Sequence, residues 1–184
     1  MVAVARPRAI DEPASADEAL AELYAAQWAP MVRLAYLLVR DQGVAEDIVA
    51  DALLALHRRW DSLNDPAAAV GYLRRSVVNG SRSVLRHRKV EQDKLPIQAA
   101  REASNLAASA EHEALGLIGN GAMLRALEQL PRRQREVLVL RYYLDLSEAQ
   151  IADALDIARG SVKAHASRGL AALRSLIASP ETEK

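Results

Sequence analysis

The chain of 184 residues contains no cysteine and no phenylalanine, and only seven prolines and eight glycines. The absence of cysteine excludes a disulfide framework, thiol catalysis and cysteine-ligated zinc, and it suits the reducing cytosol. The four histidines lie apart in the sequence, without the spacing of metal ligands. We therefore expect neither a metal site nor a cofactor, and the composition favours no enzyme class.

Long apolar runs are also missing. No run approaches the length of a membrane span, and residues 1–8 lack the apolar core of a signal peptide. Nearly every segment instead repeats its apolar residues with the period of a helix rather than in the strict alternation of a strand. The sequence therefore predicts an all-α protein located in the cytoplasm.

Charge of neither sign is in excess over the whole chain, which holds 24 basic and 24 acidic residues. The distribution is uneven, however, because residues 20–90 and 122–178 are basic and the remaining segments are acidic. Local fields rather than net charge govern the encounter with DNA. We predict two small helical domains at 20–90 and 122–178, a flexible acidic linker at 91–121, a disordered tail at 1–19 and a short tail at 179–184.

Residues 144–176 carry the most informative pattern in the chain. Ser147 is a favourable helix N-cap, and Gln150 three residues later completes a capping box. A break at residues 156–158 then leads to a second helix that begins near Arg159. The segment therefore predicts two short helices around a tight turn.

The second of these helices has an apolar face, which includes Val162 and Ala166, and an opposite face of small, polar and basic side chains. An ordinary helical hairpin also has a polar face, because that face is solvated. The capping box, the turn and the basic face together favour a helix-turn-helix whose second helix enters the major groove. The residues expected to contact duplex DNA are Arg159, Ser161, Lys163, Ala164, His165, Ser167 and Arg168.

A second signal is the segment 71–89, which contains six Lys and Arg residues and no acid. On a helical wheel, Leu73 and Val77 form an apolar face, and a row of arginines lies opposite. Arginine holds phosphates, tyrosine stacks on an unpaired base and asparagine bonds a base edge. A merely solvated basic helix has a similar pattern, but the helix-turn-helix on the same chain favours DNA contact. The expected residues, two of them from the preceding loop, are Trp60, Ser62, Tyr72, Arg75, Asn79, Arg82 and Arg86.

The helix expected over residues 44–60 has an unusual outer stripe. Asp47, Asp51, Leu54 and Arg58 share one face, opposite the apolar residues that we expect to be buried. An acidic pair beside an exposed leucine fits a docking face for a basic protein. The alternative is acid placed near a helix N-terminus for dipole reasons, at about 0.3–1 kcal/mol each. That alternative explains Asp47 and leaves Leu54 unexplained.

These segments together resemble a bacterial RNA polymerase sigma factor of the small extracytoplasmic-function (ECF) class, reduced to its region-two and region-four domains. The segment VAEDIVADALLALHRRWDSL resembles the helix that binds the clamp of core polymerase. GYLRRSVVNGSRSVLRHRK resembles the helix that melts and recognises the minus-ten element. LRALEQLPRRQREVLVLRYYLDLSEAQIADAL, followed by GSVKAHASRGLAALR, resembles region four.

The resemblance implies a promoter-specificity subunit rather than an enzyme. It implies that the outer stripe binds core RNA polymerase, with the beta and beta-prime subunits as partners. The same resemblance implies that the 71–89 helix binds minus-ten DNA and that the helix-turn-helix binds minus-thirty-five DNA. It also implies an anti-sigma factor as a further partner, and no small-molecule substrate. Two alternatives stay open: a stand-alone helix-turn-helix regulator with a dimerisation or sensor domain at 20–90, and a helical adaptor that binds only proteins.

Overall fold

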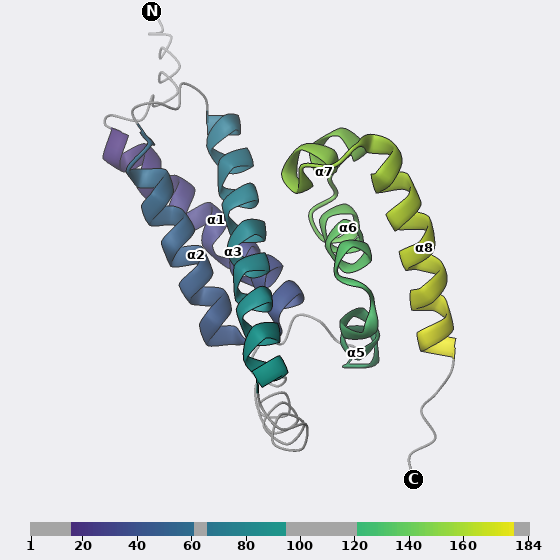
Figure 1. Cartoon of the computed structure of the whole chain (residues 1–184). Coiled ribbons are helices and arrows are strands. Elements are labelled where there is room, and N and C mark those ends of the chain that lie inside the picture. Colours follow the sequence, from purple (N-terminus) through teal and green to yellow (C-terminus); the bar gives the residue numbers. More distant parts are fainter. Residues whose placement is uncertain (1–15, 61–65, 95–120, 179–184) are drawn as a thin grey trace, which may run out of the picture.

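The computed structural model describes residues 16–60, 66–94 and 121–178, and all regular structure within these ranges is helical (Figure 1). The predicted all-α class is therefore confirmed. The helices are α1 (Ala16–Val39), α2 (Gln42–His57), α3 (Pro66–Lys94), α5 (Gly121–Gln129), α6 (Arg132–Tyr142), α7 (Glu148–Leu155) and α8 (Arg159–Ala178).

The first three helices pack side by side around one apolar core. The turn between α1 and α2 is tight because Arg40 takes a left-handed conformation with φ of 58°, and Asp41 then caps α2 by accepting a hydrogen bond from the Val44 amide at 3.0 Å. Helix α3 crosses close to α2 at Gly80, where an added Cβ would lie 2.9 Å from the Ile48 side chain. A glycine at this position allows the two helices to approach.

The last four helices form the second domain, and its helix-turn-helix follows the sequence prediction closely. Ser147 and Gln150 form the expected capping box at the start of α7. Asp156 ends that helix in a left-handed conformation, with φ of 52° and ψ of 57°. Helix α8 then begins at Arg159, as expected, and packs Val162 and Ala166 against the rest of the domain.

Some segment boundaries differ from the sequence prediction. Residues 16–19, predicted to belong to a disordered tail, form the first turn of α1. Residues 91–94, assigned to the linker, continue α3, which also starts five residues before Gly71. The predicted boundaries cut both helices short, because composition alone indicated a tail and a linker. The Ala and charged residues in these stretches have high helix propensity, so the helices extend through them.

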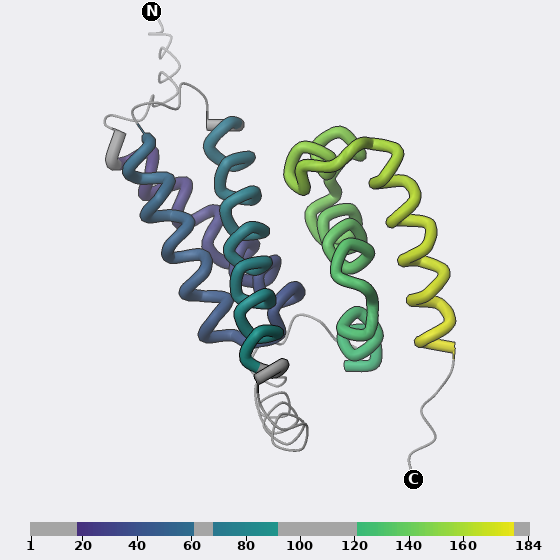
Figure 2. The backbone as a smooth tube through the Cα atoms, viewed as in Figure 1, coloured from purple at the N-terminus to yellow at the C-terminus, as the bar shows by residue number. Residues whose placement is uncertain are grey.

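The two domains pack against each other, which the sequence did not indicate. Helix α1 contacts α6, and α3 contacts α7, so that α3 lies along the second domain (Figure 2). The Tyr143 hydroxyl at the end of α6 donates a hydrogen bond to the Pro30 carbonyl of α1 at 3.2 Å. Buried residues of both domains belong to one continuous apolar cluster. The surfaces at this junction are therefore shared between the domains.

Candidate nucleic-acid interface

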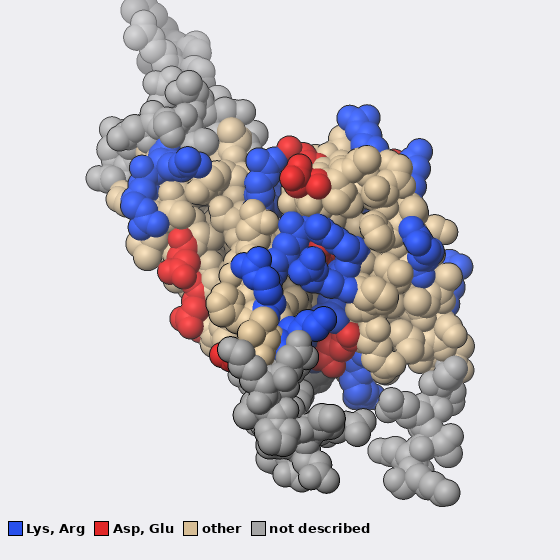
Figure 3. Space-filling model, in the orientation of Figure 1, with Lys and Arg blue, Asp and Glu red and all other residues tan. Residues whose placement is uncertain are grey.

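The outer stripe of α2 lies on the protein surface. Asp47, Asp51, Leu54 and Arg58 are all exposed, and Leu54 is 55% exposed although it is a large apolar side chain. The opposite face of α2, with Ile48, is buried in the three-helix core. Figure 3 shows acidic side chains along the edge of the molecule that α2 forms. An exposed leucine flanked by two carboxylates is thus available to another macromolecule.

The aromatic residues expected to stack on bases lie at the beginning of α3 and the end of the preceding segment. Tyr72 is half-buried, and the Arg59 guanidinium lies over its ring at 5.6 Å from the centroid. Trp60 is also half-buried and packs against the apolar core. Ser62 lies outside the described residues. A cation over one face of Tyr72 holds the ring in place and occupies that face.

The next residues on α3 contact the second domain, although Arg75 itself stays exposed. Arg75 donates hydrogen bonds to the Asp153 carboxylate at 2.5 Å and to the Asp153 carbonyl at 3.3 Å. These residues border a groove of about 380 Å³ between α3 and α7, whose other walls include Arg74 and Gln150. Burial without an acidic partner lowers the pKa of the Arg74 guanidinium. Arg75 is therefore already bound to an anionic group of the chain.

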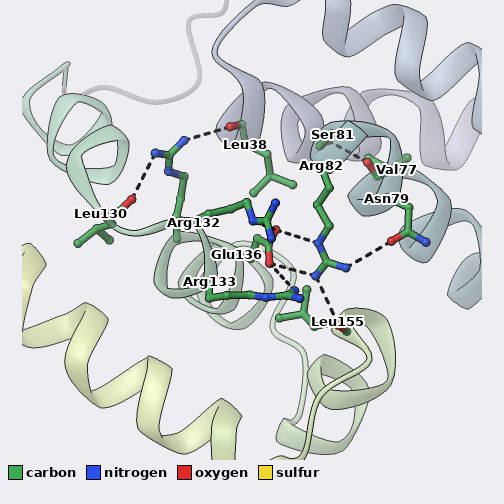
Figure 4. A network of polar contacts seen from close by, with 11 residues as sticks. Leu38, Val77, Asn79, Ser81, Arg82, Leu130, Arg132, Arg133, Glu136 and Leu155 are labelled. Carbon is green, nitrogen blue, oxygen red and sulfur yellow. Dashed lines mark hydrogen bonds and ion pairs between the residues drawn. The ribbon is translucent and has the colours of Figure 1, made fainter. Parts of the chain in front are cut away.

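Arg82 is held even more firmly at the same junction. Its Nε and Nη2 atoms donate to the two carboxylate oxygens of Glu136 on α6, at 2.9 and 3.0 Å (Figure 4). A further donor atom of Arg82 lies 3.3 Å from the Asn79 side-chain oxygen, one turn earlier on α3. This two-point geometry is the one in which a guanidinium binds a carboxylate or a phosphate.

Glu136 is the central acid of the junction. It is only 2% exposed, and Arg133 and Arg132 of its own helix approach it at 3.0 and 3.6 Å. A buried carboxylate requires such partners because its removal from water is costly. Three guanidinium groups, one from α3 and two from α6, therefore converge on a single carboxylate.

Arg135 makes a second connection between the domains. It donates to the carbonyl of Leu38 in α1 at 3.2 Å and to the carbonyls of Glu128 and Leu130 in its own domain. Burial lowers the pKa of its guanidinium; Glu128 raises that pKa in part, while Arg40 lowers it further. Arginine stays protonated through such changes, so a partly buried positive charge remains at the junction.

The helix-turn-helix presents its predicted residues unevenly. Arg159, Lys163, Ser167 and Arg168 are exposed on α8, and the remaining three predicted residues, Ser161, Ala164 and His165, are half-buried. Two of these side chains are lightly held: the Arg168 Nε donates to the Ala164 carbonyl at 3.2 Å, and the Lys163 ammonium lies 3.7 Å from Glu148. The exposed cationic face of α8 is therefore free to contact another molecule.

Gly169 is a position whose role the sequence did not indicate. It is buried where α8 crosses α6, and an added Cβ would lie 3.1 Å from Leu138 and 3.2 Å from Gln134. The glycine allows α8 to pack closely on α6. Gly169 therefore contributes to the packing of α8 on α6 and not to the exposed face of α8.

The sequence also missed the acids that bind α3. Asp153 and Glu136 belong to helices of the second domain, and nothing in their local pattern indicates partners more than fifty residues away. The only local signal was the spacing of Arg132 and Arg133 before Glu136, at i,i+4 and i,i+3, which suggests pairs within a helix. Within the described residues, no cluster of His, Asp or Glu fits a metal, and no helix has the length and apolar character to cross a bilayer.

Comparison with protein families gives two matches. A family model described as sigma-70 region 2 matches residues 23–90, and one described as sigma-70, region 4 matches residues 120–173. The RNA polymerase sigma-E factor of Streptomyces avermitilis is 32% identical over 83% of this chain and 82% of its own length. The ECF RNA polymerase sigma factor SigM of Mycobacterium tuberculosis is 32% identical over 79% of this chain and 70% of its own length.

Solved structures share the fold. The sigma factor RpoE of Bartonella quintana, in complex with the anti-sigma factor NepR, matches 88% of this chain and 98% of its own with a TM-score of 0.67 at 20% identity. CnrH, in complex with the cytosolic domain of CnrY, matches 89% of this chain and 94% of its own with a TM-score of 0.61 at 22% identity. With both regions matched and curated relatives aligned over most of their length, the chain belongs to the sigma-70 family of RNA polymerase sigma factors, in its ECF group.

Proposed function

We propose that this sigma factor divides promoter recognition among three surfaces, one each on α2, α3 and α8. As a sigma factor, the chain directs core RNA polymerase to promoters. The main observation behind this proposal is the exposed stripe on α2. Its leucine, Leu54, lies beside acids at the surface and does not belong to the buried core. In this assignment Asp47, Asp51, Leu54 and Arg58 bind polymerase, and a few central contacts of this kind provide most of the binding energy.

The second surface is the arginine face of α3, which we assign to the separated strands of the minus-ten element. Arg75 and Arg82 hold phosphates, Asn79 bonds a base edge and Tyr72 stacks on an unpaired base. Arg82 binds both oxygens of Glu136 in the free chain, so its donor geometry is already suited to a phosphate. Extrusion of a base costs a few kcal/mol and is easiest where stacking is weak.

This assignment requires the two domains to separate. Arg75 and Arg82 cannot bind Asp153 and Glu136 and DNA phosphates at once. The polymerase-binding stripe lies on α2, away from these contacts, and is exposed while the domains are packed together. We therefore infer that the chain docks on polymerase first and that α3 becomes available as the second domain moves to upstream DNA.

The third surface is the exposed face of α8, which we assign to the duplex near minus thirty-five. Lys163, Ser167 and Arg168 lie at base edges in the major groove, and Ser161 meets a phosphate near the helix N-terminus. His165, which is half-buried, contributes less direct contact than Arg168, which is exposed. Upstream base recognition therefore depends mainly on Lys163 and Arg168, and Arg159, a third exposed cation, lies at the first residue of the helix.

The wider setting of the protein follows from the same proposal. The work is done in the cytoplasm, with the polymerase, and it consists of binding rather than of a chemical reaction of the chain itself. The name of one structural relative refers to a complex with an anti-sigma factor, and we propose that a partner of this kind also restrains the present chain. A stand-alone regulator remains the alternative function. It predicts tight, salt-sensitive duplex binding by the free chain without polymerase.

The polymerase-binding surface is tested by a double variant, Asp51→Arg with Leu54→Glu. We expect this variant to lose core polymerase in a pull-down and to keep its helical circular dichroism, because both side chains point to solvent. The matched control, Glu22→Arg with Val90→Glu, makes the same types of change at exposed positions elsewhere. Full retention of polymerase by the double variant would disprove the assignment of α2.

Asn79→Ala tests the role of α3. It should impair opening of a fully paired promoter and reduce discrimination at one minus-ten base. A premelted bubble should restore opening without restoring discrimination, because separated strands remove the unstacking cost and supply no base contact. Permanganate footprinting measures both. A variant that opens and discriminates like the parent chain would make α3 a solvated basic helix only.

A further inference from the structure

The junction between the domains contains a basic groove, and Arg86 is the one residue of its lining that was also expected to contact minus-ten DNA. The groove has a volume of about 390 Å³ and is lined by Leu85, Arg86 and Lys89 of α3 and by Arg132 and Arg135 of α6. Figure 3 shows Lys and Arg side chains gathered in the middle of the face where α3 meets the second domain. Four cations and one leucine therefore surround one concave space, and none of its described lining residues is acidic.

Within the described residues, none of the four cations of the groove has an acidic partner to itself. Arg86 and Lys89 make no hydrogen bond or ion pair with any residue in the part of the chain that the structure describes. Arg132 is 3.6 Å from Glu136, a carboxylate already bound by two closer arginines. Arg135 is bound to carbonyl groups, and its Nε atom is buried without a partner. Among the described residues, the positive charge around the groove is therefore not fully neutralised.

Like charges held this close repel each other, and the repulsion opposes the packing of the two domains. A bound anion that touches both walls would remove this repulsion. Because the walls belong to different domains, an anion that needs both binds only the packed arrangement and stabilises it. An anion of this kind therefore favours the arrangement in which Arg75 and Arg82 are occupied.

The side chains also indicate the class of anion. Arginine binds phosphate oxygens in pairs, and three of the four cations are arginines. Helix α6 has Pro131 as its N-cap with no side-chain cap, and its first residue, Arg132, lines the groove, so the positive end of the helix dipole lies beside this space. The volume lies within the range of small-ligand sites and is too small for a duplex. Several phosphates on one small molecule match several cations on two walls.

We propose that the groove between α3 and α6 binds a small polyphosphate, either inorganic or the phosphate chain of a nucleotide, and that this ligand holds the two domains together. The binding itself is independent of the promoter assignment. Its consequence, that the ligand delays promoter binding, rests on the proposed function. Leu85 provides an apolar wall on which a nucleoside part would pack.

The test is calorimetric titration of the full chain with tripolyphosphate at constant ionic strength. We expect one site per chain and binding at least about tenfold tighter than that of sulfate, because several charge-assisted bonds form together. Lys89→Gln and Arg132→Gln remove one cation from each wall, and each should weaken binding about tenfold. Arg174→Gln, an exposed control on α8, makes the same change of charge and should alter binding less than about twofold.

Two further titrations decide the source and the class of the ligand. If adenosine triphosphate binds more tightly than tripolyphosphate, the ligand of the groove is a nucleotide. If the two bind equally, the groove recognises the phosphate chain alone. The proposal is overturned if the control loses as much affinity as the groove variants, which means diffuse attraction. It is also overturned if an oligonucleotide of eight thymidines binds more tightly than tripolyphosphate and depends on the same two residues, which makes the groove a nucleic-acid surface.

The same variants separate this proposal from the proposed function. Lys89→Gln and Arg132→Gln should retain core polymerase in a pull-down, because neither residue belongs to the α2 stripe. The Asp51→Arg, Leu54→Glu variant should bind tripolyphosphate like the parent chain. If the Asp51→Arg, Leu54→Glu variant keeps polymerase, the α2 assignment fails and the groove proposal stands. If Lys89→Gln and Arg132→Gln bind tripolyphosphate like the parent chain, the groove proposal fails and the α2 assignment stands.

Discussion

Replacing Glu136 by glutamine is the most direct test of the junction between the domains. The substitution keeps the side-chain size and one acceptor oxygen but removes the charge that three arginines share. Breaking a fully buried ion pair costs about 3–5 kcal/mol. Here the arginine side chains are 17%, 34% and 48% exposed, so water partly replaces the lost carboxylate. We therefore expect a loss of about 2–3 kcal/mol in the free energy of unfolding.

A double-mutant cycle with Arg82→Met divides this loss between folding and domain packing. Arg132 and Arg133 lie on the same helix as Glu136, whereas Arg82 comes from the other domain. The coupling energy between Arg82 and Glu136 should be about 1–2 kcal/mol, since neighbours in one bonded network are not additive. Urea unfolding followed by circular dichroism measures the free energies. X-ray scattering should show a larger radius of gyration for each single variant.

Glu148→Gln is the matched control for this cycle. Glu148 is 32% exposed in its side chain, and its ion pairs with Arg141 and Lys163 are longer, at 3.6 and 3.7 Å. Surface pairs of this kind contribute about 0–1 kcal/mol. If Glu136→Gln costs no more than Glu148→Gln, or if the coupling energy is below about 0.3 kcal/mol, the junction is not held by this carboxylate and the reasoning is wrong.

Three further predictions concern packing, recognition and pH. Gly80→Ala should lower the free energy of unfolding by about 1–3 kcal/mol, because the new Cβ would lie 2.9 Å from the Ile48 side chain. The control Gly71→Ala, on the same helix, meets nothing within 4 Å and should raise the free energy of unfolding by about 0.5–1 kcal/mol. Urea titration compares the two variants. Arg168→Ala should cost about 1–3 kcal/mol at one upstream base pair in a competition assay, and an equal loss for every sequence would mean a phosphate contact. Burial raises the pKa of the Tyr143 hydroxyl, and nearby Arg33 offsets this in part. Its contribution to stability is therefore complete below the unfolded pKa of about 10 and is lost as the pH rises through the higher folded pKa. Tyr143→Phe should unfold more easily at pH 8, for lack of the bond to Pro30, and should lose less stability than the parent between pH 9 and 11 in thermal melts.

The elements of each domain could be predicted because their determinants are local. The capping box at Ser147 and the apolar period of α8 depend on residues within one or two turns, and both are present as expected. The exposed stripe on α2 follows from the same periodicity, since the opposite face supplies the core. The roles assigned to these surfaces remain predictions that the described variants test.

The packing of the domains could not be predicted because its determinants are distant in sequence. Arg82 and Glu136 are 54 residues apart, and each has a sufficient local explanation, as a DNA-binding cation and as a partner of arginines in its own helix. The glycine at position 169 is similar, since its requirement arises only where α8 meets α6. Periodicity identifies which face of a helix is buried, but it does not identify the partner that covers it.

The covalent connection between the domains makes their packing independent of protein concentration. Residues 95–120 join α3 to the second domain, so Asp153 and Glu136 compete for the arginines of α3 as part of the same molecule. Tethered partners of this kind have effective concentrations on the order of millimolar. Synthesis of more chains therefore leaves the fraction of molecules with a covered α3 unchanged. On the proposed assignment of α2 to polymerase binding, the amount of free core polymerase shifts this intramolecular equilibrium and so sets how many chains expose α3.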